Sequence, residues 1–347
     1  MYYVGVDLHK EKSWFCVLDE NGSEVSSKNI SNSPEVLKAY FEEIPKPFTL
    51  AVETTYNWYF FVDLAEQYAE KVYLANSYEL KAFAKRNKKT DKIDSRLIAT
   101  VLYKGYLPTV TIPDKKTRDM RELLRYRMNL VQDRTRTIAR LKIMLDKLGE
   151  PSVGNLTTYK GLKEISYAHL SDNYRKIIAG YIEKAENLAR TIYDINTFIK
   201  QKACEDGDIL NLTTIPGLDY FSASLVKSEI IDINRFQCFD RLCAYAGLAP
   251  RVSQSGNKSI RGPLNKNRRK HLRWILLEVA YHFIKSDRRR ELRHQFLTKR
   301  KGFNTAKVIL ARDMLKVIYH VLKERRSYYR EGDFKIRSEA APALVGA

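Results

Sequence analysis

The spacing of hydrophobic residues divides the chain into a strand-rich first part and a helical remainder. Residues 2–8 and 13–19 are short runs rich in β-branched and aromatic residues, a composition typical of strands. The tetrapeptide Asp-Glu-Asn-Gly at 19–22 supplies turn residues before another strand-like run at 24–30. These three runs predict an antiparallel meander that opens a domain.

Helices and strands are expected to alternate up to about residue 85. Ser33 and Pro34 predict the start of a helix that runs to about Ile44, because proline is favoured in a first helical turn. The apolar run at 48–53 predicts a buried strand. Further elements are expected at 57–69 (helix), 71–75 (strand) and 77–85 (helix). The order β-β-β-α-β-α-β-α predicts an α/β domain with a mixed sheet.

From residue 115 to 148 the pattern becomes that of one long amphipathic helix. This stretch contains neither proline nor glycine, and its apolar residues recur at helical spacing. A second such helix is expected at 173–204, after a looser segment with Pro151 and Gly154. An antiparallel helical hairpin follows from this pattern. It is either a coiled-coil arm for dimerisation or nucleic-acid binding, or a bundle within one domain.

The sequence Ile-Pro-Gly-Leu at 215–218 lies between two helical segments. It resembles a helix-hairpin-helix, in which a glycine turn exposes backbone N–H groups to a phosphate, although a plain turn fits equally well. The small residues after about 335 indicate a disordered tail. We therefore expect a mixed-sheet α/β domain at 1–108, a helical arm at 109–205, a mainly helical C-terminal domain at 206–330 and a disordered tail at 331–347.

The charge of the chain points to a polyanionic partner. Its 61 Lys and Arg residues against 41 Asp and Glu give a net charge of +20. Residues 251–301 alone hold sixteen basic and three acidic residues, as a nucleic-acid-binding surface would. A basic surface without such a role, or a ribosome-associated protein, is the alternative.

Cysteine spacing and hydropathy restrict the cellular setting. The four cysteines lack the partners of a zinc site and are expected to be reduced thiols. The N-terminal segment does not have the pattern of a signal peptide, and no apolar run approaches the roughly 20 residues of a membrane span. These features predict a soluble, cytoplasmic protein with no membrane partner.

Four acidic residues of the first domain stand where a phosphotransfer site needs them. Asp7 lies within the first strand among apolar residues, and Glu53 ends the buried strand at 48–53. Asp91 and Asp94 are three residues apart at the start of a helix, so they project from one face. If the first and fourth strands are neighbours, as in a ribonuclease-H-like sheet, all four carboxylates converge.

Such a group of carboxylates predicts a site for Mg²⁺. Close negative charges repel unless a divalent ion neutralises them, and oxygen ligands suit Mg²⁺. Two ions about 4 Å apart would assist transfer of a phosphodiester. Each residue also has a structural alternative: Asp91 and Asp94 complement the dipole of a helix capped by Thr90, and Glu53 ends a strand.

Several motifs in the same order along the chain resemble the DEDD transposases of the insertion-sequence "one-ten" family, which includes the Piv-type DNA invertases. In the first domain these are G-V-D-L-H-K at 5–10, V-E-T-T at 52–55 and K-T-D-K-I-D-S at 89–95. The C-terminal motifs are I-P-G-L at 215–218, F-x-x-F-D-R-L-x-A-Y-A-G-L-A-P at 236–250 and Q-S-G at 254–256. One departure is the lack of a glycine before Leu272-Arg273.

The resemblance implies more than the residues alone. It implies a RuvC-like N-terminal domain whose metal ligands match Asp7, Glu53, Asp91 and Asp94, and a nucleophilic serine that matches Ser255. That serine would form a transient phosphoserine link with DNA; from its neighbours alone it is a loop serine, with Ser253 and Ser259 as rivals. The family also uses a noncoding bridge RNA that pairs with donor and target DNA. Strand exchange needs several active sites, so a homo-oligomer is expected.

Two other functions fit parts of the pattern. A RuvC-like nuclease or junction resolvase would need the carboxylates and would only cleave. A nucleic-acid-binding scaffold with an inactive fold would need neither Asp7 nor Ser255. The carboxylates together with the resemblance imply an Mg²⁺-dependent, RNA-guided DNA transposase, and these two functions remain the alternatives.

Overall fold

The computed structural model describes residues 1–83, 90–150, 154–255, 258–264 and 268–328. Contacts divide the chain into two units, Met1–Pro113 and Asp114–Ala347. The predicted disordered tail, 331–347, lies outside the described residues. The expected boundary between arm and C-terminal domain at 205/206 stays a prediction.

The first unit is built on a six-stranded sheet with the strand order β3-β2-β1-β4-β5-β6. Strand β1 pairs in parallel with β4, and β4 with β5, while the other pairs are antiparallel. This confirms the predicted mixed sheet. The strands are β1 (Tyr2–Leu8), β2 (Lys12–Leu18), β3 (Glu24–Ser31), β4 (Phe48–Glu53), β5 (Lys71–Ala75) and β6 (Thr109–Val110). The helices are α1 (Pro34–Glu43), α2 (Trp58–Ala65), α3 (Ser77–Leu80) and α4 (Asp91–Tyr103).

Each face of this sheet has its own cover. On one face, large side chains such as Val6, Phe15 and Leu50 pack with Phe41 of α1 and Phe61 of α2. On the other face the central strands carry small residues, and α4 lies against them. The difference follows from the sequence, because the alternating positions of β1 and β4 hold valine and leucine on one face and glycine and alanine on the other.

Gly5 sets how closely α4 approaches the sheet. A Cβ atom at this position would lie 2.2 Å from the Ser95 backbone oxygen and 2.3 Å from the Ala99 backbone nitrogen. Both atoms belong to the backbone of α4, so no side-chain movement could make room. Gly5 is paired with Ala51 on β4, which is also small. The residues thus bring the helix backbone into contact with the strand, two positions before Asp7.

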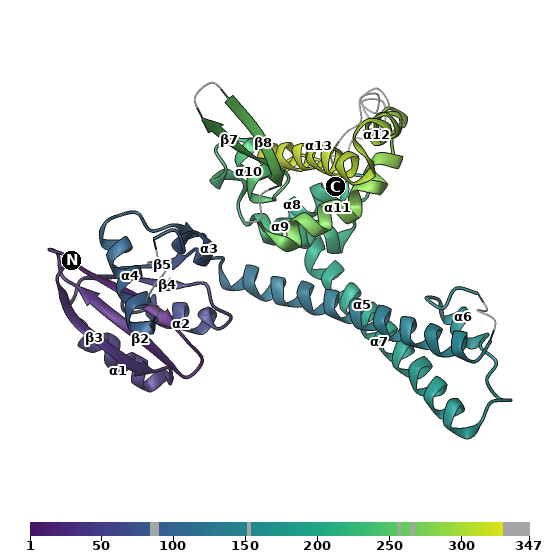
Figure 1. The fold of residues 1–347 in the computed structure, drawn as a ribbon, viewed down its shortest axis with the longest axis horizontal. Coiled ribbons are helices and arrows are strands. Elements are labelled where there is room, and N and C mark those ends of the chain that lie inside the picture. The colour runs from purple at the N-terminus through teal and green to yellow at the C-terminus, as the bar shows by residue number, and fades with distance from the viewer. Residues whose placement is uncertain (84–89, 151–153, 256–257, 265–267, 329–347) are drawn as a thin grey trace, which may run out of the picture. The chain divides into compact units, whose positions relative to one another are not determined.

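Two 33-residue helices, α5 (Lys115–Lys147) and α7 (Asp172–Cys204), run side by side in the second unit (Figure 1). Both were expected within a residue of these bounds. Their far ends share a small core in which Leu141 and Leu145 pack against Ile178 and Ile182. The short helix α6 (Tyr159–Lys163) lies between them in the chain. The helical hairpin is therefore present, and its role as a coiled-coil arm remains a prediction.

The rest of the second unit is a set of helices with one β-hairpin. The helices are α8 (Gly207–Thr213), α9 (Tyr220–Ile230), η1 (Ile233–Arg235), α10 (Phe239–Tyr245), α11 (Lys270–Lys285), α12 (Arg288–Lys301) and α13 (Phe303–Glu324), and the hairpin consists of β7 (Pro250–Ser255) and β8 (Lys258–Leu264). Leu124 of α5 and Ile199 of α7 enter the same hydrophobic core as these helices. This shared core explains why the long helices and the C-terminal helices form one unit.

The Ile-Pro-Gly-Leu segment forms a turn between α8 and α9. Gly217 has a φ of +93°, which glycine adopts without strain. A Cβ atom there would lie 3.0 Å from the His282 Cβ and 3.0 Å from the Val279 backbone oxygen. The glycine is therefore explained by the left-handed turn and by close packing on α11. The structure shows two helices joined by this turn, and phosphate binding by the turn stays a prediction.

Candidate carboxylate metal site

Strand pairing places Asp7 and Glu53 side by side. The parallel register of β1 and β4 pairs Val6 with Val52, and Asp7 and Glu53 are the next residues of the two strands. Parallel strands end at the same edge of a sheet, so both carboxylates belong to one edge. Asp7 has only 7% of its surface exposed, whereas Glu53 is partly exposed. The neighbouring first and fourth strands that the sequence analysis required are thus present.

Helix α4 brings the other two acids to this edge. Thr90 caps the helix through its side chain, which accepts a hydrogen bond from the Ile93 backbone N–H at 3.3 Å. Asp91 and Asp94 occupy the first turn of the helix. Ser95, the residue after Asp94, lies against Gly5 of β1. Capping and dipole complementation therefore do apply to these acids. They do not compete with a metal-binding role, because the same turn lies over β1.

His9 joins Asp7 to Asp91. Its Nε2 atom lies 3.2 Å from Asp7 Oδ2 and 3.3 Å from Asp91 Oδ2. Ligand atoms of these three side chains all lie within 4.8 Å of one another, close enough to share one ion. His9 was not among the site residues predicted from the sequence. Its position two residues after Asp7, in G-V-D-L-H-K, was the available signal.

The backbone of His9 is held from two sides. Its carbonyl oxygen accepts hydrogen bonds from Nδ2 of Asn32 and Nδ2 of Asn57, each at 2.8 Å. Asn32 is itself fixed by the Ser13 hydroxyl, which donates to Asn32 Oδ1 at 2.6 Å in a buried contact. The turn after β1 is therefore rigidly positioned beside the carboxylates.

The electrostatics of Asp7 reflect all of these neighbours. Burial raises its pKa to about 6; His9 opposes this rise, and the negative charges of Asp91, Asp94 and Glu53 add to it. Asp94 and Glu53 thus lie near enough to act on Asp7. Among the residues that the structure describes, the ligand atoms that lie close enough to share one ion are those of Asp7, His9 and Asp91. A buried carboxylate among three others is unfavourable when ionised, and a bound cation would relieve that repulsion.

Ser255 belongs to the other unit. It is the last residue of β7 and pairs with Lys258 of β8, so it ends a strand. The structure thus places Ser255 at the end of a strand, where its neighbours in the sequence had predicted a loop serine; residues 256–257 lie outside the described residues. The hairpin could not be predicted from the sequence because Ser, Arg, Gln and Lys make up most of its two strands and its apolar positions are few.

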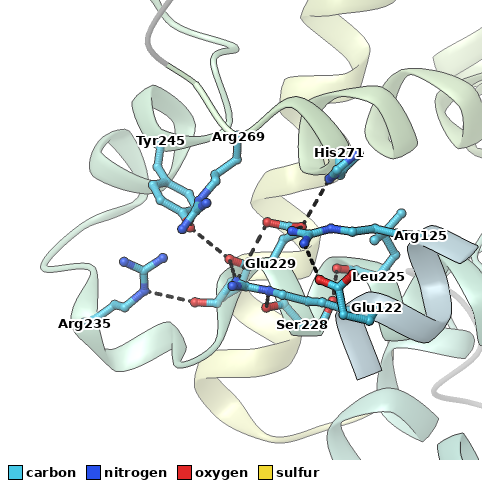
Figure 2. A network of polar contacts seen from close by, with 11 residues as sticks. Glu122, Arg125, Leu225, Ser228, Glu229, Arg235, Tyr245, Arg269 and His271 are labelled. Carbon is cyan, nitrogen blue, oxygen red and sulfur yellow. Dashed lines mark hydrogen bonds and ion pairs between the residues drawn. The ribbon is translucent and has the colours of Figure 1, made fainter. Parts of the chain in front are cut away.

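A buried glutamate, Glu229, forms a network of polar contacts among helices of the second unit (Figure 2). Glu229, at the end of α9, has 1% of its surface exposed. Its carboxylate lies 3.8 Å from Arg121 and 3.7 Å from Arg125, both on α5, and 3.6 Å from His271 Nδ1 on α11. Its carbonyl oxygen accepts a 3.0 Å hydrogen bond from the Tyr245 hydroxyl. The network thus connects the long helix α5 to α9 and α11.

The same network reaches the segment next to the hairpin. Arg269 Nε donates a hydrogen bond of 2.6 Å to the Tyr245 hydroxyl, and Arg121 Nε donates one of 2.9 Å to the Ser228 carbonyl. Burial alone would raise the pKa of Glu229. The contact with His271 and the charges of Arg121, Arg269 and Arg125 outweigh it and lower the pKa to about 2. Glu229 is thus a fixed anion that holds several cations in place.

Comparisons with known proteins agree with both halves of this description. The DEDD transposase model of the IS110 elements, described as "Transposase", matches residues 4–149. A second family model, "Transposase IS116/IS110/IS902 family", matches residues 210–295. The first contains all four predicted carboxylates, and the second contains Ser255 and Glu229.

Curated relatives match over most of the chain. The transposase for insertion sequence element IS1111A from Coxiella burnetii is 24% identical over 340 residues, covering 94% of this chain and 90% of that protein. The transposase for insertion sequence element IS1328 from Yersinia enterocolitica is 24% identical over 278 residues, covering 80% and 82%. The chain belongs to the IS110 transposase family, the "one-ten" family that its motifs resemble. Among the described residues, no helix is long and apolar enough to cross a membrane.

Proposed function

We propose that this transposase cuts and exchanges DNA strands with a metal-bound carboxylate site and a serine nucleophile, guided by RNA. The observation that carries the proposal is the convergence of Asp7, Asp91 and His9 at one sheet edge, with the charges of Glu53 and Asp94 acting on the same point. The strand order, with β1 beside β4, supports a ribonuclease-H-like domain.

The residues present suit a hard divalent cation such as Mg²⁺. Carboxylate oxygens are its preferred ligands, and the repulsion that raises the pKa of Asp7 is the kind that a cation removes. Asp7, Glu53, Asp91 and Asp94 would hold it. When bound, the ion supplies a Lewis acid that stabilises negative charge on phosphate oxygens. His9 is a further donor at this site, either as a ligand or as a hydrogen-bond donor to the ligating carboxylates.

Ser255 is proposed as the nucleophile. Its oxygen forms a bond to phosphorus, its hydroxyl proton is lost, and a deoxyribose oxygen leaves with a proton, which gives a phosphoserine link and a free hydroxyl end. Re-attack by another deoxyribose hydroxyl reverses the bond changes and releases the serine. A serine hydroxyl needs activation for such an attack. The carboxylates belong to the first unit of the chain and Ser255 to the second.

Charge supports the nucleic-acid partners. Helix α12 has no buried residue among its fourteen, and seven of them are Lys or Arg. Such a surface binds phosphate backbones of DNA and RNA alike. We include a bridge RNA and a homo-oligomer in the proposal on the strength of the family resemblance.

The test is the covalent adduct between the full-length protein and labelled DNA that carries the joined ends of the element. Wild-type protein with Mg²⁺ should give an adduct that survives denaturing electrophoresis and disappears on protease treatment. Ser255→Ala should give none and should exchange no strands. The neighbouring Ser253→Ala is the matched control and should keep both activities.

The nuclease alternative makes the opposite prediction. If Ser255→Ala cleaved DNA at the wild-type rate, the serine mechanism would be wrong and a metal-dependent nuclease would be the better description. Omitting the bridge RNA tests guidance separately, because recombination at the specified target should then stop. Continued recombination at that target without RNA would exclude RNA guidance.

A further inference from the structure

Next to the carboxylates, a row of side chains crosses the sheet from β1 through β2 to β3. The antiparallel register places Trp14 of β2 opposite Asp7, and Asn29 of β3 opposite Trp14. Residues directly opposite in antiparallel strands have their side chains on the same face. Asp7, Trp14 and Asn29 therefore form a row on the face that α4 covers further along. Neither Trp14 nor Asn29 has a role in the proposed mechanism.

A cavity of about 330 Å³ lies beside Trp14 and Asn29 of this row. Its lining comprises Trp14 and Asn29, the turn residues 9–12, and Asp91 from α4. His9 and Asp91 are also members of the carboxylate cluster. The cavity is thus continuous with the candidate metal site, and any group bound in it lies next to a phosphate held there.

The cavity is formed before a ligand arrives. Asn32 holds the turn at both ends, since its side chain donates to the His9 carbonyl and its backbone N–H donates to the Glu11 carbonyl, each at 2.8 Å. Asn32 is 8% exposed and its partner Ser13 is fully buried. A site that needs no reorganisation loses less free energy on binding. The turn therefore forms a fixed side of the cavity.

The chemistry of the lining fits one nucleotide. An indole ring stacks on any base, and an amide offers both a donor and an acceptor to a base edge. The exposed ammonium groups of Lys10 and Lys12 are suited to phosphates. The volume lies at the lower end of the range for small-ligand sites and is too small for a duplex.

We propose that this cavity is a nucleotide subsite for the DNA strand being cut. The base next to the reacting phosphate stacks on Trp14, Asn29 contacts its edge, and Lys10 or Lys12 contacts the neighbouring phosphate. This inference rests on the proposed function, because that function places a DNA phosphate at the carboxylates. A stacked base in this cavity must leave its place in the duplex, so the subsite holds a single-stranded nucleotide.

The experiment uses the fluorescence of Trp14. In the full-length protein with Trp58→Phe and Trp274→Phe, Trp14 is the remaining tryptophan of the three. A twelve-residue oligothymidylate is added in Ca²⁺ buffer, and the anisotropy of a red-labelled copy reports saturation. We expect quenching of Trp14 that follows saturation. Unchanged emission at saturation would overturn the subsite, and quenching by oligouridylate alone would overturn its assignment to DNA.

A second measurement does not depend on the folding of that variant. Wild-type protein is irradiated with the same oligonucleotide containing 5-iodouracil, and the adduct is mapped by mass spectrometry. We expect the adduct on Trp14, and an adduct confined to other residues contradicts the proposal. Trp14→Ala should weaken oligothymidylate binding about tenfold, within the range of base–aromatic stacking, and Trp14→Phe should restore most of it. The exposed Tyr106→Ala is the matched control and should bind normally.

Asp7→Asn separates this inference from the proposed function. Placed in the single-tryptophan protein, it should abolish DNA cleavage while quenching persists, because stacking on Trp14 needs no metal chemistry. Quenching together with undiminished cleavage would contradict the metal mechanism and leave the subsite standing. Lost cleavage without quenching in either protein would contradict the subsite and leave the mechanism standing.

Discussion

Replacing Gly5 with alanine should separate helix α4 from the sheet and weaken the carboxylate site. The new Cβ atom would lie 2.2 Å from one backbone atom of α4 and 2.3 Å from another. Ordinary van der Waals contact of a Cβ atom begins at 3.4 Å, so the helix would have to retreat by roughly 1 Å. Forcing a methyl group into a packed core costs about 1–3 kcal/mol. Because Asp91 and Asp94 begin this helix, they would retreat from Asp7 with it.

The functional loss should exceed the loss of stability. A displacement of about 1 Å at a reacting centre can reduce a rate about 100-fold. We therefore expect Gly5→Ala to stay folded, to lose about 1–3 kcal/mol in urea unfolding, and to form the DNA adduct about 100 times more slowly. Rates are measured at a temperature where circular dichroism shows the variant fully folded.

Gly180→Ala provides the control. Gly180 lies inside α7, and a Cβ atom there meets nothing within 4 Å. Alanine in a helix interior is favoured over glycine by up to about 1 kcal/mol, so this variant should be slightly more stable and fully active. Adduct formation by Gly5→Ala within twofold of the wild-type rate would refute the claim that Gly5 sets the position of α4 over the carboxylates.

Two further predictions concern charge and capping. The pKa of Glu229 is lowered from 4.5 to about 2, so its stabilisation is complete above about pH 4.5 and is lost as the pH falls toward 2. Glu229→Gln should therefore lower the free energy of unfolding by about 3 kcal/mol at pH 7 and have nearly the wild-type value near pH 2. Urea titrations at both pH values measure this, and the same difference between variant and wild type at pH 7 and pH 2 would contradict it. Thr90→Ala removes the hydrogen bond from the Ile93 N–H and should lower the free energy of unfolding by about 1 kcal/mol. Relative to wild type, hydrogen exchange should become faster at the start of α4 and stay the same in α7. Unchanged exchange at the start of α4 would show that the cap is unimportant.

Most of the first unit could be predicted because its signals are local. The strand 48–53 is predicted by its continuous apolar run between turn residues, and the mixed sheet by the alternation of strands and helices around it. Convergence of Asp7 and Glu53 needed one further assumption, the pairing of β1 with β4, which the structure shows. The sequence could not yield the role of Gly5, because glycine in a strand has several causes and only the position of α4 identifies this one.

Other features depend on contacts between distant residues. His9 is recognised as part of the site through its contact with Asp91, which lies 82 positions further along the chain. Glu229 was overlooked because a glutamate in a helix of average composition is usually exposed, and its partners come from α5 and α11. The hairpin at Ser255 has too few apolar residues to be predicted from alternation. Local pattern thus identifies elements, and long-range packing decides which of their polar residues form sites.

The central claim is that the carboxylates around Asp7 form the metal site of a DNA-cutting enzyme. Its most direct test is the Mg²⁺ dependence of strand cleavage by wild-type protein and by Asp7→Asn, with Glu35→Gln on α1 as an acidic-residue control. We predict that wild type and control cleave only with a divalent ion, and that Asp7→Asn is slower by at least about 100-fold at any Mg²⁺ concentration. Undiminished Mg²⁺-dependent cleavage by Asp7→Asn would contradict the account.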